Sequence, residues 1–368
     1  MSPKPRLPHN VALPTRWQIT HGAVYYRVPP GQEHRWDGKT RFRLGGTLAE
    51  AHRTWAERMD LDSRADIRTV GQLLDRYLLE VIPAKAPKTQ REQRPAVGRL
   101  REVFGPLPLA DHRPQHVYRY YDQRSAKTAA SRELEILSHA YTKAVEWGLI
   151  ARHPTLGQVR LPGEQARDRY VEDWEVIEAL SLPARRRRGS VLMVQAYIRL
   201  KLLTGMARGD LLRLTVSDLR EDGIHIQRHK TRRSSGKRTI YAWDTAPDEH
   251  GIQRRELGRL WQAVEAAKAV RPVDISPFIF CTRMGQSYVD EAQGTANGWD
   301  SLWGRFMTRV LAETAVTERF HEHDLRAKAG SDADSREHAR ALLSHVDARL
   351  TDRVYRRRPE VVKPGKGV

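Results

Sequence analysis

The sequence is poor in cysteine and contains no long apolar segment. Its one cysteine, Cys281, excludes an internal disulfide and any zinc site built from several cysteines. No apolar run approaches the roughly 18 residues that a membrane-spanning helix needs. The N-terminal segment MSPKPRLPHN lacks the apolar core of a secretory signal. These absences predict a cytoplasmic protein with no membrane partner.

Carboxylates in a metal-binding arrangement are also lacking. Asp75–Glu80 and Glu172–Glu178 contain acidic residues, but they are typical of amphipathic helix faces. A two-metal nuclease needs several Asp and Glu side chains that converge on the ions. We therefore expect neither a metal ion nor another cofactor.

Positive charge, by contrast, is abundant. The 64 Lys and Arg residues exceed the 45 Asp and Glu residues, which leaves a net charge of +19. Ion pairs within the protein cannot neutralise this excess, so it indicates a polyanionic partner, usually nucleic acid. A ribosomal or merely adhesive basic protein is the alternative. A hydrophobic content of 39% with nine Trp residues is enough for packed cores and excludes a disordered basic tail.

The length of 368 residues favours two or three domains. Residues 1–15 are rich in proline and polar groups, which predicts a disordered N-terminus. Short strands are expected at Trp17–Thr20, Ala23–Val28 and Thr40–Leu44, and a helix at Thr47–Met59, so that residues 16–62 form a small module. Its arginines, including Arg27, Arg41 and Arg43, fit either a sheet laid into a DNA groove or an ordinary solvated basic face.

Residues 67–152 have the periodicity of four helices. The first begins after Thr69 and ends before Pro83, and the second, Lys88–Phe104, contains Pro95, which weakens that prediction. Basic candidates for DNA contact lie on or between these helices, namely Lys88, Arg124 and Lys127. Residues 153–168 are rich in Pro and Gly and predict an interdomain linker, followed by a mostly helical domain over 169–358.

Four segments of this last domain carry candidate chemistry. In the first, a Thr204-Gly205 turn precedes a helical pattern with Asp210 in its first turn. In the second, Ile224–Tyr241 alternates as a basic hairpin, with Lys230 at the end of its first strand and Arg232 near its tip.

The third segment is His323-Asp324-Leu325-Arg326, where His323 and Arg326 share one helix face and can address one phosphate. The fourth is Leu342–His345, followed ten positions later by Tyr355 among arginines. Each segment alone is a weak signal, because a lone histidine is more often packed than catalytic. Their order and spacing together are much more specific.

In this order the segments resemble the tyrosine recombinase, or phage integrase, family, and the resemblance covers most of the chain. It implies a multidomain, mainly α fold: a three-stranded β plus helix arm-type DNA-binding module (16–62), a SAM-like helical core-binding domain (67–152), a mostly α catalytic domain with a β-hairpin (169–358), and a C-terminal tail (359–368). It also implies double-stranded DNA attachment sites as partners and a homo-tetramer on paired sites. An excisionase or a host DNA-bending protein is a further expected partner.

The resemblance assigns roles to the candidate residues. Tyr355 attacks the scissile phosphate and forms a 3′-phosphotyrosine, which conserves the energy of the phosphodiester bond. Arg326 binds the non-bridging oxygens of that phosphate, and His323 and His345 donate hydrogen bonds or move protons. Lys230 protonates the leaving 5′-oxygen. The supporting residue Asp210 orients a neighbouring His or Arg.

One expected residue is missing. The family has its first catalytic arginine two residues after the glycine, and this position is Ala207. Arg208 follows, but in a helix it points about 100° away. Three interpretations remain: a deliberately inactivated variant, a naturally weakened enzyme, or substitution by Arg208 after local rearrangement. Ser344 is a smaller departure, because the family usually has glycine before this histidine.

Three rival functions remain. A non-catalytic DNA-binding regulator fits Ala207 but leaves the retained catalytic candidates unexplained. A type IB topoisomerase uses similar tyrosine chemistry but does not account for the arm-like module. A basic structural or RNA-binding protein leaves the order of the segments unexplained.

Overall fold

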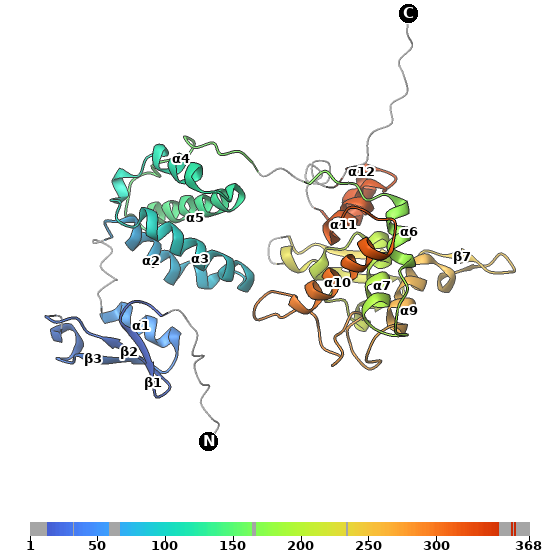
Figure 1. The fold of residues 1–368 in the computed structure, drawn as a ribbon, viewed down its shortest axis with the longest axis horizontal. Coiled ribbons are helices and arrows are strands. Elements are labelled where there is room, and N and C mark those ends of the chain that lie inside the picture. The colour runs from blue at the N-terminus through green and yellow to red at the C-terminus, as the bar shows by residue number, and fades with distance from the viewer. Residues whose placement is uncertain are drawn as a thin grey trace, which may run out of the picture. The chain divides into compact units, whose positions relative to one another are not determined.

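The computed structural model describes residues 13–31, 33–58, 67–163, 167–232, 235–345, 355 and 357. The chain forms two compact units, Met1–Gly163 and Glu164–Val368 (Figure 1). The structure confirms a multidomain, mainly helical fold with small antiparallel sheets. None of the described helices is long and apolar enough to cross a membrane.

The N-terminal module, residues 13–58, is a three-stranded antiparallel sheet covered on one face by a helix. Its elements are β1 (Trp17–Thr20), β2 (Ala23–Arg27), η1 (Glu33–Trp36), β3 (Arg41–Gly45) and α1 (Leu48–Arg58). The alternating pattern of β2 places Val24 and Tyr26 in the core, where they pack with Trp36 of the unforeseen turn η1. The strand pairs Arg27–Arg41 and Tyr25–Arg43 leave the three predicted DNA-contact arginines exposed on the opposite face.

The helical bundle, residues 67–161, has four main helices and a single apolar core. Its elements are α2 (Val70–Glu80), η2 (Ile82–Ala84), α3 (Pro87–Phe104), η3 (Leu109–Asp111), α4 (Pro114–Gln123) and α5 (Lys127–Glu146). Thr69 caps α2 by accepting a hydrogen bond from the Gln72 backbone, as its spacing predicts. Pro95 lies inside α3 without ending it.

The segment predicted as a linker is packed at both ends. Val159 and Leu161 contact the core of the bundle, and the Arg160 backbone donates to the Tyr118 hydroxyl at 3.0 Å. On the other side, Arg167 pairs with Asp324 of the second unit. The bundle therefore extends beyond residue 152, because apolar residues in the Pro- and Gly-rich segment still pack on it.

The C-terminal unit, here called the catalytic unit after its predicted role, comprises the described residues from 167 onward and is built around helix α7. Its helices are α6 (Asp173–Ser181), α7 (Ser190–Thr204), α8 (Arg208–Leu211), α9 (Arg259–Ala269), α10 (Asn297–Glu313), α11 (Glu322–Ser331) and α12 (Arg336–Leu342). Helix α7 is buried on nearly all sides because α9, α10 and α11 pack against it (Figure 1). A helix that is apolar all round belongs in a core.

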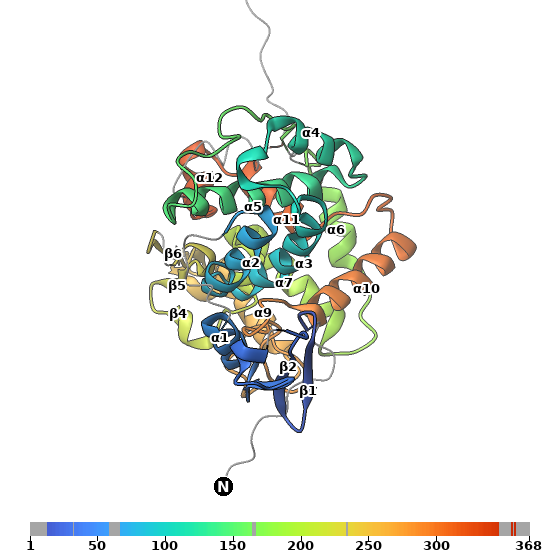
Figure 2. The same cartoon turned by 90° about the vertical axis from the view of Figure 1, so that its left-hand side faces the viewer.

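The hairpin predicted within Ile224–Tyr241 is part of a larger sheet. Strands β4 (Leu219–Arg220), β5 (Gly223–Gln227) and β6 (Arg238–Ala242) pair antiparallel in this order (Figure 2). A second small hairpin pairs β7 (Ala246–Pro247) with β8 (Gln253–Arg254) and was not expected. Short 3₁₀ turns connect these elements, at Val216–Asp218, His229–Thr231 and Arg255–Leu257.

Some predictions fall on residues that the structure does not describe. These are the disordered N-terminus over 1–12, the end of the module at 59–62, part of the hairpin tip at Ser234, the arginines around Tyr355 other than Arg357, and the tail 359–368.

Candidate active site

Four of the predicted catalytic residues converge in the catalytic unit. The Tyr355 hydroxyl lies 3.2 Å from Nε2 of His323, and the Tyr355 ring centroid lies 4.8 Å from that of His345. The guanidinium carbon of Arg326 lies 5.3 Å from the centre of the same ring. Residues separated by up to 32 positions therefore form one cluster, here called the catalytic cluster: His323, Arg326, His345 and Tyr355.

Arg326 is held by acceptors from separate parts of the chain. Its guanidinium donates to the Gly205 carbonyl after α7, to the Leu343 carbonyl at 2.7 Å, and to Nε2 of His345 at 3.2 Å. The side chain is buried, and burial lowers the pKa of Arg326. The group remains a cation at neutral pH because arginine ordinarily titrates far above it. A fixed, buried cation is what charge developing on a phosphate requires.

Tyr355 is positioned by its backbone and by its neighbour Arg357. The Ser331 hydroxyl, at the end of α11, donates to the Tyr355 carbonyl at 2.8 Å and accepts from the Arg357 backbone at 2.7 Å. The Arg357 guanidinium donates to buried Asp324 at 2.7 Å. These contacts anchor the tyrosine on the helix that carries His323 and Arg326.

Both histidines of the cluster are neutral at physiological pH. Burial, helped by the Arg326 guanidinium, lowers the pKa of His345 to about 3. Desolvation of the ring by neighbouring groups, helped by Arg357, lowers the pKa of His323 to about 4, although part of the residue is open to solvent. Arg357 lies 3.4 Å from Nδ1 of His323 and can only donate, so this contact favours the tautomer in which Nε2 carries the proton toward the Tyr355 oxygen.

Ala207 leaves the expected arginine position without a charge, and Arg208 does not replace it. Ala207 is the N-cap of the short helix α8, and the Arg208 side chain turns toward acidic partners. It pairs with Asp300 at 2.7 Å and with Glu322 at 3.4 Å. Rearrangement of Arg208 into the cluster would break both ion pairs, so the structure does not support that interpretation.

A different arginine lies beside the cluster. Arg228, just after β5, donates to the Ser344 carbonyl at 3.3 Å, next to His345. Its Nε faces the carboxylate of Asp210 at 3.8 Å, and that carboxylate also accepts from the His229 backbone at 2.8 Å. Sequence reasoning missed Arg228, although it lies two residues before Lys230 in the basic hairpin.

The structure corrects the placement of Lys230. Strand β5 ends at Gln227, so Lys230 lies in the following 3₁₀ turn, where it is exposed. The second lysine of the hairpin, Lys237, instead reaches the His345 carbonyl at 3.0 Å. Arg232 is exposed.

A buried lysine next to Ala207 was also missed. The Lys201 ammonium, on α7, donates to the Met206 carbonyl at 3.1 Å and contacts the Tyr197 hydroxyl at 3.3 Å. Burial lowers the pKa of Lys201 to about 7. The only sequence signal for it is a lysine within the otherwise apolar run of α7.

The predicted DNA-contact residues of the bundle are partly engaged inside the protein. Arg124 pairs with buried Glu133 at 2.9 Å, and the Lys127 ammonium donates to two carbonyls at the end of α4. Lys88 is exposed and lies 3.8 Å from Glu92. Arg124 and Lys127 therefore have structural roles that compete with DNA contact. The described residues contain no group of three or more His, Cys, Asp or Glu side chains that could hold a metal ion.

Comparison with solved structures shows the same fold in integrases. The chain is similar to lambda integrase in a tetramer bound to a Holliday junction, with a TM-score of 0.59 and 18% identity over 97% of this chain and 99% of that one. It is also similar to residues 82–397 of the Tn1549 transposon integrase in complex with circular intermediate DNA, with a TM-score of 0.56 and 16% identity over 77% of this chain and 94% of that one.

No protein-family profile and no curated protein matches the sequence. The structural likeness nonetheless confirms, at the level of the fold, the resemblance to tyrosine recombinases.

Proposed function

We propose that the chain is a site-specific DNA recombinase that cuts and rejoins DNA through a covalent 3′-phosphotyrosine at Tyr355, in the integration and excision of a phage or mobile element. The convergence of His323, Arg326 and His345 around the Tyr355 side chain carries this proposal. A structural role for the buried His345 beside the buried Arg326 would not require an exposed histidine and a partly exposed tyrosine next to them.

In the proposed reaction the Tyr355 oxygen attacks phosphorus and the bond from phosphorus to the 5′-oxygen breaks. The phenol proton leaves to solvent or a neighbouring base, and the 5′-oxygen gains a proton. Arg326 stabilises the charge on the non-bridging oxygens, and a neutral His323 with its proton on Nε2 stabilises the phenolate as it forms. Lys230 is the proton donor that the resemblance implies, whereas Lys237 is the hairpin lysine nearer the cluster.

Arg228 supplies the second guanidinium of the site, in place of the arginine that is missing at position 207. It approaches from the hairpin rather than from the turn after α7, and Asp210 orients it. Such a substitution is imperfect, because a cation on a hairpin is less fixed than one on the turn after α7. The chain is therefore a weakened enzyme. The alternative is a non-catalytic DNA-binding regulator, which Ala207 alone favours.

The remaining parts of the chain have matching roles. The exposed arginine face of the N-terminal module binds arm-type DNA, and the bundle and the catalytic unit each contact double-stranded core sites. Lys88 and Arg232 contact the backbone there. Lambda integrase forms a tetramer on a Holliday junction, and we propose a homo-tetramer on paired sites here, with an excisionase or host DNA-bending protein as accessory.

A nicked duplex that carries the element's own core site tests the proposal, because cleavage traps a covalent protein–DNA product. We expect Ala207→Arg to raise trapping by about tenfold, which is part of the roughly 10²–10³ that a whole donor contributes, because Arg228 already supplies some of this charge. Adding Tyr355→Phe should abolish it. If Ala207→Arg binds the duplex tightly but never forms a covalent product, the regulator is the better account. Relaxation of supercoiled DNA that lacks the site would instead indicate a topoisomerase.

A further inference from the structure

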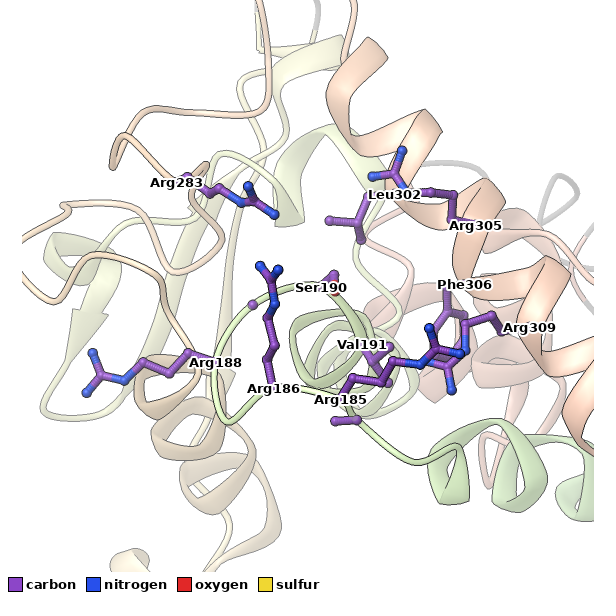
Figure 3. A pocket seen from close by; sticks show the side chains of 12 residues that line it. Arg185, Arg186, Arg188, Ser190, Val191, Arg283, Leu302, Arg305, Phe306 and Arg309 are labelled. Atoms are coloured by element: carbon purple, nitrogen blue, oxygen red, sulfur yellow. The ribbon is translucent and has the colours of Figure 1, made fainter.

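A second arginine-rich site lies in the catalytic unit, away from the catalytic cluster. A hollow is lined by the segment 184–191 except Arg187, by Arg283 and by one face of α10 (Figure 3). Six arginines surround it, namely Arg185, Arg186, Arg188, Arg283, Arg305 and Arg309. Leu302 and Phe306 of α10, both buried, form part of its apolar lining. We call this site the arginine hollow.

The charges around the hollow are only partly neutralised by the protein. Arg188 pairs with Asp274 at 2.9 Å and extends away from the hollow, and Arg309 pairs with Glu313 at 2.6 Å (Figure 3). Arg185 lies near the same Glu313. The other three, Arg186, Arg283 and Arg305, have no acidic partner among the described residues.

Arg186 and Arg283 reach toward one another from facing sides of the hollow (Figure 3). Cations that face one another repel unless an anion lies between them. The planar guanidinium binds two phosphate oxygens at once, so several unpaired arginines around one hollow suit a chain of phosphates. The unpaired arginines are exposed, so a large ligand can reach them.

The hollow and the catalytic cluster lie at opposite ends of helix α7. Ser190, the first residue of α7, lines the hollow, whereas Gly205, which follows the last, accepts a hydrogen bond from Arg326. A helix of this length spans about 20 Å. A phosphate in the hollow is therefore not the scissile phosphate. Along one duplex the two would be about six base pairs apart, at roughly 3.4 Å per pair.

We propose that the arginine hollow is a second DNA site, which binds backbone phosphates outside the cleavage position. This proposal rests on the proposed recombinase function, since it takes DNA as the polyanion that the protein handles. Contact is to phosphates alone and carries no sequence preference of its own. It adds affinity for DNA that extends beyond, or lies beside, the duplex on the catalytic cluster.

The test neutralises the hollow and measures the salt dependence of DNA binding. The triple variant Arg186→Gln, Arg283→Gln, Arg305→Gln removes the unpaired charges. The matched control Arg187→Gln, Arg199→Gln, Arg220→Gln removes three exposed arginines outside the hollow. Both are made in the full chain and bound to a 60-base-pair duplex of arbitrary sequence. Each lost phosphate contact lowers the slope of log affinity against log salt by about 0.9.

We expect the hollow variant to lose about 2 to 3 in slope and the control to lose less than one. Both variants should unfold at the temperature of the parent. A hollow variant with the parent's slope would overturn the proposal. A second result would also overturn it: the parent binds inorganic tripolyphosphate and the hollow variant does not, while both bind DNA equally well. The hollow would then be a site for free polyphosphate.

Covalent trapping separates this proposal from the recombinase function. In the Ala207→Arg background, on a short nicked core duplex, the hollow variant should trap DNA as well as the parent does. Trapping with no change in slope leaves the recombinase standing and removes the hollow as a DNA site. A change in slope without any trapping supports DNA contact at the hollow but removes the recombinase.

Discussion

The two ends of helix α7 use arginine in opposite ways. At the C-terminal end, Arg326 is buried and donates to two carbonyls and a histidine, so its guanidinium has one orientation. At the N-terminal end, Arg186 and Arg283 are exposed and unpaired within the described chain. A fixed cation suits a single atom in a transition state, whereas exposed, unpaired cations suit a polyanion of variable position.

The comparison teaches that charge count alone does not locate an active site. The hollow has more arginines than the catalytic cluster, yet it has no candidate nucleophile. No tyrosine or cysteine lines it, and its one serine, Ser190, has no histidine or carboxylate beside it in the lining. What distinguishes the cluster is that protein acceptors hold the Arg326 charge beside the Tyr355 side chain. Substitutions at the two ends should therefore separate catalysis and stability from DNA affinity.

The largest expected effect is that of Arg326→Ala in the Ala207→Arg background. Covalent trapping should fall by at least about 10²–10³. The carbonyls of Gly205 and Leu343 lose their hydrogen-bond donor, and each unsatisfied carbonyl reduces the free energy of unfolding by about 1–3 kcal/mol. In a unit of this size, each kcal/mol lowers the melting temperature by about 2–4 °C. Trapping and thermal unfolding measure the two effects.

Arg326→Lys is the matched control for Arg326→Ala. It keeps the positive charge, but a lysine cannot donate to the Gly205 carbonyl, the Leu343 carbonyl and His345 at the same time. The neutralised hollow should lose neither trapping nor stability. Equal loss of stability at both ends of α7 would contradict the comparison.

The second prediction distinguishes the two arginines near Ala207. Arg228→Ala should lower trapping by about 10²-fold, because it removes the guanidinium beside His345. Arg208→Ala should leave trapping nearly unchanged but lower the melting temperature, because Glu322 loses its ion pair. Introducing Ala207→Arg should reduce the effect of Arg228→Ala to a few-fold. An unchanged effect would show that Arg228 does not act in place of the missing residue.

The third prediction concerns pH. Unfolded histidines bind protons below about 6.5, while the folded state keeps His323 and His345 neutral down to about 4 and 3. Between about pH 6.5 and 4 the unfolded state therefore binds more protons than the folded state. The stabilising effect of keeping the two histidines neutral is complete above pH 6.5, and the free energy of unfolding decreases as the pH falls toward 4. Melting temperatures at pH 7.5, 6.0 and 5.0 measure it.

His345→Gln should flatten this pH dependence, because it removes the titrating group whose pKa is most strongly shifted.

The arginines of the hollow do not titrate in this range. The difference in salt slope between the parent and the hollow variant should consequently be the same at pH 6.0 and 7.5. A pH-dependent difference would implicate a titrating group in the hollow.

The smallest effect is expected at Ser344. Its φ of 52° lies in the left-handed region, which costs a non-glycine residue about 1–2 kcal/mol. Its hydroxyl, however, lies 2.7 Å from the Thr239 hydroxyl, and a hydrogen bond is worth about 1 kcal/mol. Ser344→Gly should therefore change stability by less than about 1 kcal/mol. In the Thr239→Val background it should be clearly stabilising, and thermal unfolding of the four variants tests this.

Much of the fold could be predicted from local patterns. The strands of the N-terminal module begin and end within a residue or so of the expected positions, because alternation and Gly or Pro breaks are local signals. Helix α2 begins at its predicted cap. The buried turn at Trp36 and the packing of Val159 and Leu161 could not be predicted, because each depends on contacts distant in sequence.

The sequence by itself determined the order of the elements and the chemical types that could act, including Tyr355, Arg326 and the absence of an arginine at 207. Only the tertiary structure decided which charges are neutralised. Arg208 and Arg228 look equally available in the sequence. In the structure, Arg208 pairs with acidic residues of α10 and α11, whereas Arg228 donates a hydrogen bond to the carbonyl just before His345. Partners so distant in the chain are selected by packing, which local spacing does not encode.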